Sequence, residues 1–354
     1  MSIENELSSL ENRDDSNFFL RVLKYFCPWK GDSISDIIRK IIFIASIVIF
    51  CVSLGELIDF YNGSDEEYQT LAKIQEFEPG TNEESAAKAE LPKQDLLIPE
   101  KMLPKWYELY SLNQDIIGWV KIDTFRAKKN DPKTCFINYP VVQVDDNKEY
   151  LHKDIYGNTL ESGTLFADYF VPITPFHRPD VITVYGHNMR SVGTMFTHLG
   201  EYKRGVKFLK QNPIIDFDTL YTNGERYIII GAYIANYKES QDDGEVFYYW
   251  RFTDFDNDKY TFKKFKEGID KRTWYSNDID CREDDEYLTL STCSNEVDDL
   301  RWVITARKIR KNEKEKDIEK MVDSYQKKED KDIYLPKCWR DVWGQVTMYK
   351  GWDY

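Results

Sequence analysis

The chain lacks closely spaced cysteine pairs, which argues against a zinc-binding motif and against a small domain held together by many disulfides. Its six cysteines are dispersed over 354 residues, and no two of them form a Cys-x-x-Cys pair. The spacings match no zinc ribbon or finger, and a dense disulfide framework is excluded, although one or two bridges are compatible with the pattern. Because 42% of the residues are hydrophobic, the chain can form a substantial core without cross-links.

An excess of positive charge is also absent. The chain has 48 Lys and Arg against 62 Asp and Glu, and its formal net charge is −14. Proteins that bind nucleic acids need a basic surface, so no nucleic-acid partner is expected. A metal site made of His187, His198 and Cys293 is formally conceivable, but the two histidines are eleven residues apart, which is not the close spacing of a metal-binding pair on a helix face. We therefore expect no metal and no cofactor.

One long apolar run lies near the N-terminus. Residues 41–54 read IIFIASIVIFCVSL, and the apolar span extends over residues 37–58. About 20 residues cross a bilayer core, and no clear A-x-A-like cleavage site follows, so the run predicts an uncleaved transmembrane anchor rather than a signal peptide or a buried helix. Basic residues precede the span, and none follows it until Lys73. The positive-inside bias therefore predicts a cytoplasmic segment at 1–36 and an extracellular remainder.

The rest of the chain divides by composition. Residues 59–97 are polar and acidic, which predicts a linker, loosely ordered from residue 62 onward. Residues 98–310 open with a helical pattern and continue with strand-like runs, which indicates the main folded domain. Residues 311–354 form a C-terminal extension with a charged amphipathic helix around Ile318 and Val322, followed by an aromatic-rich end that we expect to dock on this domain.

Strand-like runs dominate the main domain. They are rich in Val, Ile, Thr and Tyr, are bounded by turn residues, and cover 116–122, 135–143, 163–169, 181–186, 226–235, 286–293 and 301–309. Few helices separate them, which argues against a parallel βαβ sheet and favours a mainly β fold, a mostly antiparallel or mixed barrel. An insertion of about fifty residues before the run at 286–293 carries a predicted helix over roughly 253–269, with Thr253 as a weak N-cap.

Three residues at strand ends could form a nucleophilic site. Cys293 ends the run TLSTC, His187 follows a strand and Gly186, and Arg301 opens the next strand eight residues after the cysteine. A thiolate attacks acyl groups, an imidazole exchanges protons with the substrate, and a cation can stabilise the oxyanion. If the last two strands pair antiparallel, the guanidinium returns beside the thiol. The alternatives are a core cysteine and a turn histidine.

These motifs resemble the sortases, membrane-anchored cysteine transpeptidases of Gram-positive surfaces. The sortase pattern combines TLxTC, an arginine on the next strand and a histidine on a distant strand, as in TLSTC, Arg301 and YGHNM here. The likeness extends to NQDIIGWVKI, YPVVQ, DNKEYLHKD and SGTLFADY, and the N-terminal helix and the long helix-bearing insertion before the cysteine strand resemble class B. Two departures are a longer connection at 125–136 and the extension after residue 310.

The resemblance implies a closed β-barrel with a substrate cleft. Cys293 would attack the Thr carbonyl of an NPxTN-like sorting signal on a surface protein, and an amine of a peptidoglycan precursor or a pilin would release the thioester. His187 would act first as acid and then as base, and Arg301 would hold the oxyanion or the substrate backbone. Four further residues are predicted to line the peptide site: Asn147, Leu151, Ser291 and Thr292. Each of the four also has an ordinary structural interpretation.

Two other functions fit the same residues. A plain thiol hydrolase would pass the acyl group to water, and a non-catalytic, membrane-tethered binding or assembly protein could use the same barrel. The joint presence of Cys293, His187 and Arg301 argues against the second alternative, because a scaffold without activity is free to lose any of them. Turnover of a signal peptide with and without an added amine separates the first alternative from a transpeptidase.

Overall fold

The computed structural model describes residues 18, 22–80, 97–124, 135–170, 172–190, 192–243, 246–256 and 258–347. The chain forms two compact units, residues 1–66 and 67–354. The N-terminal unit contains most of helix α2, Ile34–Gln75. Large apolar side chains along this helix are exposed, for example Ile42 and Phe50. Among the described residues, α2 is the one helix that is long and apolar enough to cross a membrane.

Helix α2 extends further than the sequence analysis predicted. The connector expected at 59–97 was to be loosely ordered from residue 62, but residues 62–75 continue the helix. Leu71 and Ile74, which belong to the second unit, are buried in its core, and the neighbouring Glu, Gln and Lys residues favour helix. The prediction of a loose connector is therefore wrong for this part, because side-chain burial outweighs the polar composition. Residues 81–96 lie outside the described residues.

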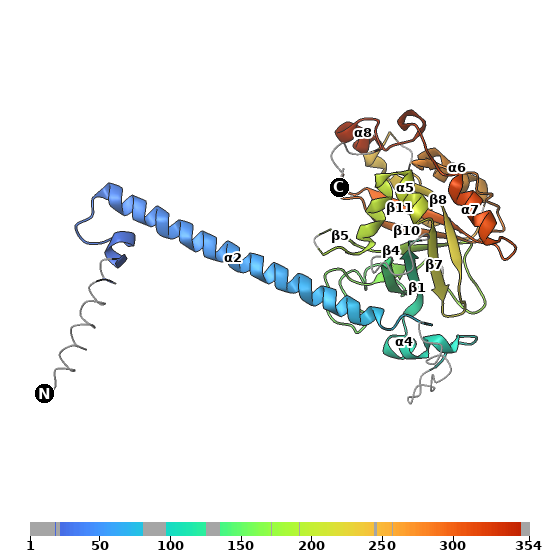
Figure 1. The fold of residues 1–354 in the computed structure, drawn as a ribbon, viewed down its shortest axis with the longest axis horizontal. Helices are drawn as coiled ribbons and strands as arrows, with labels where there is room; N and C mark the ends of the chain where they lie inside the picture. The colour runs from blue at the N-terminus through green and yellow to red at the C-terminus, as the bar shows by residue number, and fades with distance from the viewer. Residues whose placement is uncertain are drawn as a thin grey trace. The chain divides into compact units, whose positions relative to one another are not determined.

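The second unit is built on a closed β-barrel, as predicted (Figure 1). Its strands are β1 (Ile116–Asp123), β2 (Cys135–Val142), β3 (Leu165–Ala167), β4 (Val181–Tyr185), β7 (Ile214–Thr219), β8 (Arg226–Ala235), β10 (Tyr287–Cys293) and β11 (Arg301–Lys308). The order around the barrel is β1-β2-β3-β4-β10-β11-β8-β7. The seven strand-like runs correspond to seven of these strands. The sequence analysis missed β7, which pairs with β1 and β8 and closes the barrel.

Two pairings bring the candidate residues to one rim of the barrel. Strand β10 runs parallel to β4, with Ser291 opposite Tyr185, so both strands end on the same side. Strand β11 runs antiparallel to β10, with Arg301 opposite Cys293 at the turn. Two short antiparallel strand pairs lie outside the barrel among the described residues. They are β5 (Asn188–Met189) with β6 (Thr194–Met195), and β9 (Tyr275–Ser276) with β12 (Gln326–Lys327).

Helices surround the strands in Figure 1. They are α4 (Tyr107–Leu112), α5 (Val206–Gln211), α6 (Phe262–Arg272), α7 (Glu315–Asp323) and α8 (Lys337–Trp343), with short 3-10 helices η1 (Pro104–Trp106), η2 (Phe196–Arg204), η3 (Glu239–Gln241), η4 (Tyr249–Arg251) and η5 (Asp330–Asp332). The helix predicted at 253–269 begins later, because Thr261 rather than Thr253 caps it by accepting from the Lys264 amide. Phe255 packs on Phe265 from the preceding loop, so its spacing imitated a helix.

The C-terminal extension packs on the barrel. Helix α7 buries Ile318 and Val322, the two residues whose spacing predicted it. Trp339 of α8 is 2% exposed, and its ring centroid lies 6.1 Å from that of Trp274, which in turn lies 4.7 Å from Trp302 of β11. The prediction that the aromatic-rich end docks is thus confirmed for the residues up to 347. Residues 348–354 lie outside the described residues.

Candidate functional site

The thiol and the guanidinium meet at the turn between two barrel strands. Cys293 ends β10, Arg301 begins β11, and the Arg301 Nη1 atom lies 3.4 Å from the Cys293 Sγ atom. The connecting loop reverses tightly, with Asn295 and Asp299 at φ 63° and 64°. Asn and Asp tolerate this left-handed conformation better than other residues with a side chain. The local sequence therefore folds so that the cation returns to the thiol.

The backbone of His187 is held beside the end of β10. Beyond the last strand pair, the Gly186 amide donates to the Ser291 carbonyl at 3.2 Å, and the Thr292 hydroxyl donates to the Gly186 carbonyl at 2.7 Å. On the other side of the histidine, the Asn188 carboxamide donates to the Cys293 carbonyl at 2.9 Å. The two neighbours of His187 in the chain are thus hydrogen-bonded to the last three residues of β10, Ser291, Thr292 and Cys293.

Gly186 is required for this close approach. A Cβ atom at this position would lie 2.2 Å from a methyl group of Leu165 and 2.8 Å from the ring of Phe196. A larger residue would displace the strand end that carries His187. The signal noted in the sequence, a glycine between a strand and a histidine, therefore reflects packing against two buried neighbours.

The imidazole of His187 is oriented by the loop at residues 151–152. Its Nε2 atom lies 3.0 Å from the Leu151 carbonyl oxygen. A carbonyl can only accept, so Nε2 carries the proton and Nδ1 is the nitrogen left to exchange a proton with a substrate. The ring of His152 stacks on that of His187, with centroids 5.4 Å apart and an angle of 25° between the planes. The sequence analysis did not single out His152.

Burial sets the protonation of His187. Desolvation lowers the pKa of its imidazole below the ordinary value of a histidine, and the bond to the Leu151 carbonyl opposes this effect. The positive charges of His152 and Arg301 also lower the pKa, whereas Glu161 raises it. Arg301 is therefore within electrostatic range of the imidazole as well as in contact with the thiol. The backbone positions of Cys293, His187 and Arg301 lie at one rim of the barrel, and the meeting of the imidazole with the thiol stays a prediction.

Arg301 is itself supported by a second loop. Its guanidinium lies over the ring of Tyr237, 5.0 Å from the centroid. The Tyr237 hydroxyl donates to Asp299 Oδ1 at 3.0 Å, and Lys238 pairs with the same carboxylate. Hydrogen bonds from Lys238 and Tyr237 lower the pKa of Asp299. Asp299 thus braces Arg301 through Tyr237.

The four predicted peptide-site residues have different surroundings. Asn147 donates to Asp168 at 3.2 Å and accepts from the Tyr169 amide at 3.1 Å, while Leu151 is half-buried and contacts His187 through its carbonyl. Ser291 and Thr292 are buried, and their hydroxyls bond to Tyr249 and Gly186. Internal bonds therefore engage both hydroxyls, and a contact of these residues with substrate stays a prediction.

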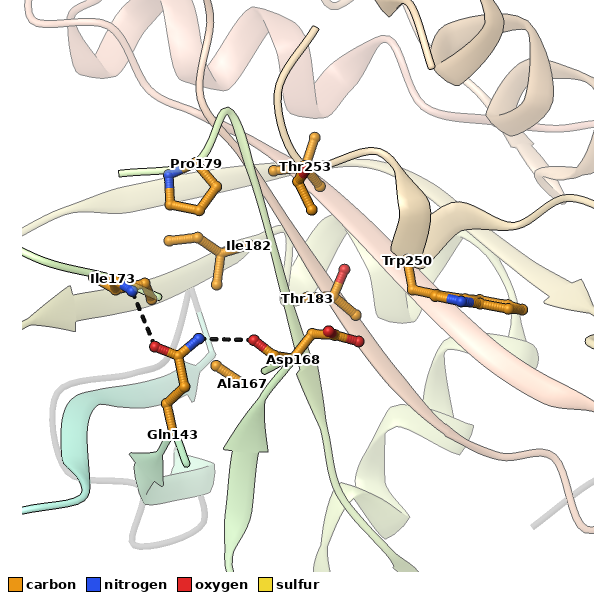
Figure 2. Close-up of a pocket in the computed structure, with 10 residues that line it drawn as sticks. Gln143, Ala167, Asp168, Ile173, Pro179, Ile182, Thr183, Trp250 and Thr253 are labelled. Carbon is orange, nitrogen blue, oxygen red and sulfur yellow. Dashed lines mark hydrogen bonds between the residues drawn. The ribbon is translucent and has the colours of Figure 1, made fainter. Parts of the chain in front are cut away.

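Asn147 is held by Asp168, which lines a small cavity. Figure 2 shows Gln143 donating to the Asp168 carbonyl at 2.7 Å and accepting from the Ile173 amide at 2.9 Å. The cavity has a volume of about 10 Å³, which is room for about one water molecule. The carboxylate of Asp168 accepts from Asn147 and, at 2.7 Å, from the Tyr185 hydroxyl. Internal hydrogen bonds therefore fix the side chain of Asn147.

A larger cleft lies away from the three candidate residues. A cleft of about 550 Å³ follows helix α6, and the described residues that line it include none of the three at the barrel rim. Within the described part of the chain, no group of three or more His, Cys, Asp or Glu side chains could hold a metal ion.

Comparison with known proteins decides the family. No protein-family model matches the sequence. Sortase B of Listeria monocytogenes is 30% identical over 192 residues, which cover 54% of this chain and 68% of that relative. The chain belongs to the sortase B family. Sortase B of Staphylococcus aureus is 27% identical over 213 residues, 60% of this sortase and 77% of the relative.

Solved sortase structures share the fold. The Staphylococcus aureus sortase B–substrate complex aligns with a TM-score of 0.53 at 25% identity, covering 70% of this sortase and 98% of that chain. Sortase B from B. anthracis in complex with AAEK1 aligns with a TM-score of 0.52 at 23% identity, covering 71% and 100%. These findings confirm the predicted class B-like fold and the cysteine transpeptidase activity, and they place this sortase among cell-envelope enzymes.

Proposed function

We propose that Cys293, His187 and Arg301 carry out the transpeptidation catalysed by this sortase. The observation that carries the proposal is the 3.4 Å approach of the Arg301 guanidinium to the Cys293 sulfur, at the rim where the backbone of His187 is fastened. A nearby cation favours the thiolate, which is the nucleophilic form of cysteine. The same cation can stabilise the negative charge that develops on a carbonyl oxygen during attack.

The first half of the reaction forms a thioester. The Cys293 thiol gives its proton to Nδ1 of His187, and the sulfur attacks the carbonyl carbon of the scissile peptide bond. A C–S bond forms while the carbonyl oxygen becomes negative beside Arg301. As the tetrahedral intermediate collapses, the C–N bond breaks and His187 gives its proton to the leaving amine. The proton leaves from Nδ1, because Nε2 stays bonded to the Leu151 carbonyl.

The second half transfers the acyl group to an amine. An incoming amine attacks the thioester carbonyl, His187 takes the proton from the new ammonium, and the C–S bond breaks to return Cys293. Each half therefore uses the same imidazole in opposite protonation states, which suits a group whose pKa lies near or below neutrality. Burial lowers the pKa of His187 in this direction.

The proposed substrate is a C-terminal sorting signal of NPxTN-like sequence on a surface protein, cleaved at the Thr carbonyl. Asn147 and Leu151 lie on the loop that reaches His187, so they are the best placed of the four predicted peptide-site residues. A Staphylococcus aureus sortase B has been solved with a substrate, and another sortase B has been solved with triglycine. Those complexes support a peptide donor and an amine acceptor, here an amine of a peptidoglycan precursor or a pilin.

The proposed topology follows from helix α2 and the charge bias. Residues 37–58 would cross the membrane once, with 1–36 in the cytoplasm and the catalytic domain, 98–310, outside the cell. The linker at 59–97 would be helical as far as Gln75, and the extension at 311–354 would stabilise the catalytic domain. Labelling cysteines placed at either end of the span with a membrane-impermeant maleimide tests this orientation in intact cells.

The experiment for the reaction uses the full chain in detergent micelles with a signal peptide, with and without a free amine. We expect Cys293→Ala and His187→Ala to abolish turnover. Cys281→Ala is the matched control, because burial raises the pKa of the Cys281 thiol to about 11 and makes it a poor nucleophile. Full turnover in Cys293→Ala would refute the assignment. Release of free acid alone, with no amine adduct, would identify a hydrolase.

A further inference from the structure

We propose that His152 is a positioning residue for His187: its ring holds the catalytic imidazole in place. The proposal rests on the role of His187 given above. The two rings stack with centroids 5.4 Å apart and planes 25° from parallel. His152 directly follows Leu151, whose carbonyl bonds to His187 Nε2. One dipeptide therefore contacts His187 at a ring face and at a ring edge.

The loop that carries this dipeptide is fixed on both sides. The Leu151 amide donates to the Lys148 carbonyl at 3.1 Å, and the His152 carbonyl accepts from the Leu160 amide at 3.1 Å. Gly163 lies so close that a Cβ atom there would be 2.4 Å from the Leu151 carbonyl oxygen. The stacking ring is therefore presented by a braced backbone, which is what positioning of a catalytic group requires.

The two histidines differ in exposure. The side chain of His152 is 56% exposed, whereas His187 is half-buried. The His152 Nδ1 atom lies 3.1 Å from the Glu161 carbonyl oxygen and 4.0 Å from the Glu161 carboxylate. The charged and titratable groups that act on the His187 imidazole are His152 and Glu161 from this loop and Arg301 from β11.

The closeness of His152 also acts on the pKa of His187. Burial lowers the pKa of His187 most, the Leu151 bond raises it, and His152 is the next contribution and lowers it. Removing the charge of His152 is therefore expected to raise the pKa of His187.

The test compares His152→Phe, which keeps a flat ring but no charge, with His152→Ala, which removes the ring. His177→Phe is the matched control, because His177 is also about half exposed but faces Asp254. Full-length protein with ¹⁵N-labelled histidine is titrated by NMR in micelles, and His187→Ala identifies the His187 signals. Turnover of a signal peptide with an added amine gives kcat and KM.

We expect His152→Ala to lower kcat about tenfold with little change in KM, as for a misplaced catalytic group. His152→Phe should recover most of that loss and should raise the pH at which His187 titrates, and His177→Phe should change neither quantity. An unshifted His187 titration in His152→Phe, or a wild-type kcat in His152→Ala, would overturn the proposal. Turnover that survives in His187→Ala would instead refute the proposed function. The two failures can be told apart, because the NMR titration of His187 does not depend on catalysis.

Discussion

The guanidinium of Arg301 lies over the ring of Tyr237, 5.0 Å from its centroid, while its Nη1 atom contacts the Cys293 sulfur. A cation held on a ring face keeps its orientation without using its donors for that contact. Tyr237 is fixed in turn by its hydroxyl bond to Asp299. Donors placed before the reaction begins stabilise a developing oxyanion better than donors that must move into position.

Replacing Arg301 by Ala should lower kcat/KM by about 10² to 10³, the effect of losing one oxyanion donor. Arg301→Lys should recover only part of the loss, because an ammonium lacks the planar fork of donors. The measurement is steady-state turnover of a signal peptide with a free amine. Arg190→Ala is the control, since Arg190 pairs with Glu296 on a partly exposed neighbouring surface. Equal losses in the two Ala variants would argue against a specific role for Arg301.

Tyr237 should act through its ring more than through its hydroxyl. We expect Tyr237→Leu to lower kcat about tenfold, because Arg301 loses the aromatic face that orients it. Tyr237→Phe keeps the ring and gives up only the bond to Asp299, so its kcat should fall much less. Steady-state kinetics on the two variants decide the point. If Phe and Leu behave alike, the hydroxyl, and not the ring, holds the site together.

The pH profile of kcat/KM should have its acid limb below the ordinary histidine range. The reaction needs His187 to accept a proton, so activity is lost at low pH, where the imidazole is already protonated. Burial lowers the pKa of His187, so this loss occurs only at lower pH and activity extends in that direction. An acid limb above the ordinary histidine value would contradict this reasoning.

Thr292→Val separates a structural role from substrate binding. The side chains have almost the same shape, but valine leaves the Gly186 carbonyl without the 2.7 Å bond from the Thr292 hydroxyl. We expect the free energy of unfolding to fall by about 1–3 kcal/mol and kcat to fall, because the strand end that carries His187 loosens. Thermal melting and kinetics are the readouts. A raised KM with unchanged stability would show instead that Thr292 contacts the peptide.

Trp339→Ala should destabilise the catalytic domain by about 3–5 kcal/mol, the usual cost of removing a fully buried large ring. Trp339 is 2% exposed, whereas Val342 on the same helix is 57% exposed and provides the control. Val342→Ala should change stability by less than about 0.5 kcal/mol. Chemical denaturation of both variants measures the difference. Equal stability of the two would mean that the extension does not support the core.

Local sequence patterns predicted most of the barrel because its strands are long and apolar, as β8 is from Arg226 to Ala235. Strand β7 escaped notice because it is short and two of its six residues, Asp216 and Asp218, are charged. The predicted end of helix α2 came too early in the chain, because Leu71 and Ile74 are buried by the core of the second unit. In each case, contacts made by distant parts of the chain decided the outcome, and local composition does not report such contacts.

The candidate site shows the same division. Motif and position predicted that Cys293, His187 and Arg301 would meet, and the pairing of β10 with β4 and β11 brings their backbone positions to the same rim. The stacking of His152 and the support from Tyr237 could not be predicted, because both residues lie in loops without periodic patterns. One weak signal was available: His152 sits inside DNKEYLHKD, a stretch that already drew attention, and the chain has only 4 histidines.

The contact between Thr292 and Gly186 joins positions 106 residues apart, through a parallel strand pair. Contacts of such long range form late, because a large loop must close before they contribute any stability. A chain still emerging from the ribosome therefore carries its thiol well separated from its proton carrier. The reactive pair comes into existence only once almost the whole domain has been made, which protects the incomplete polypeptide and its neighbours from premature acylation.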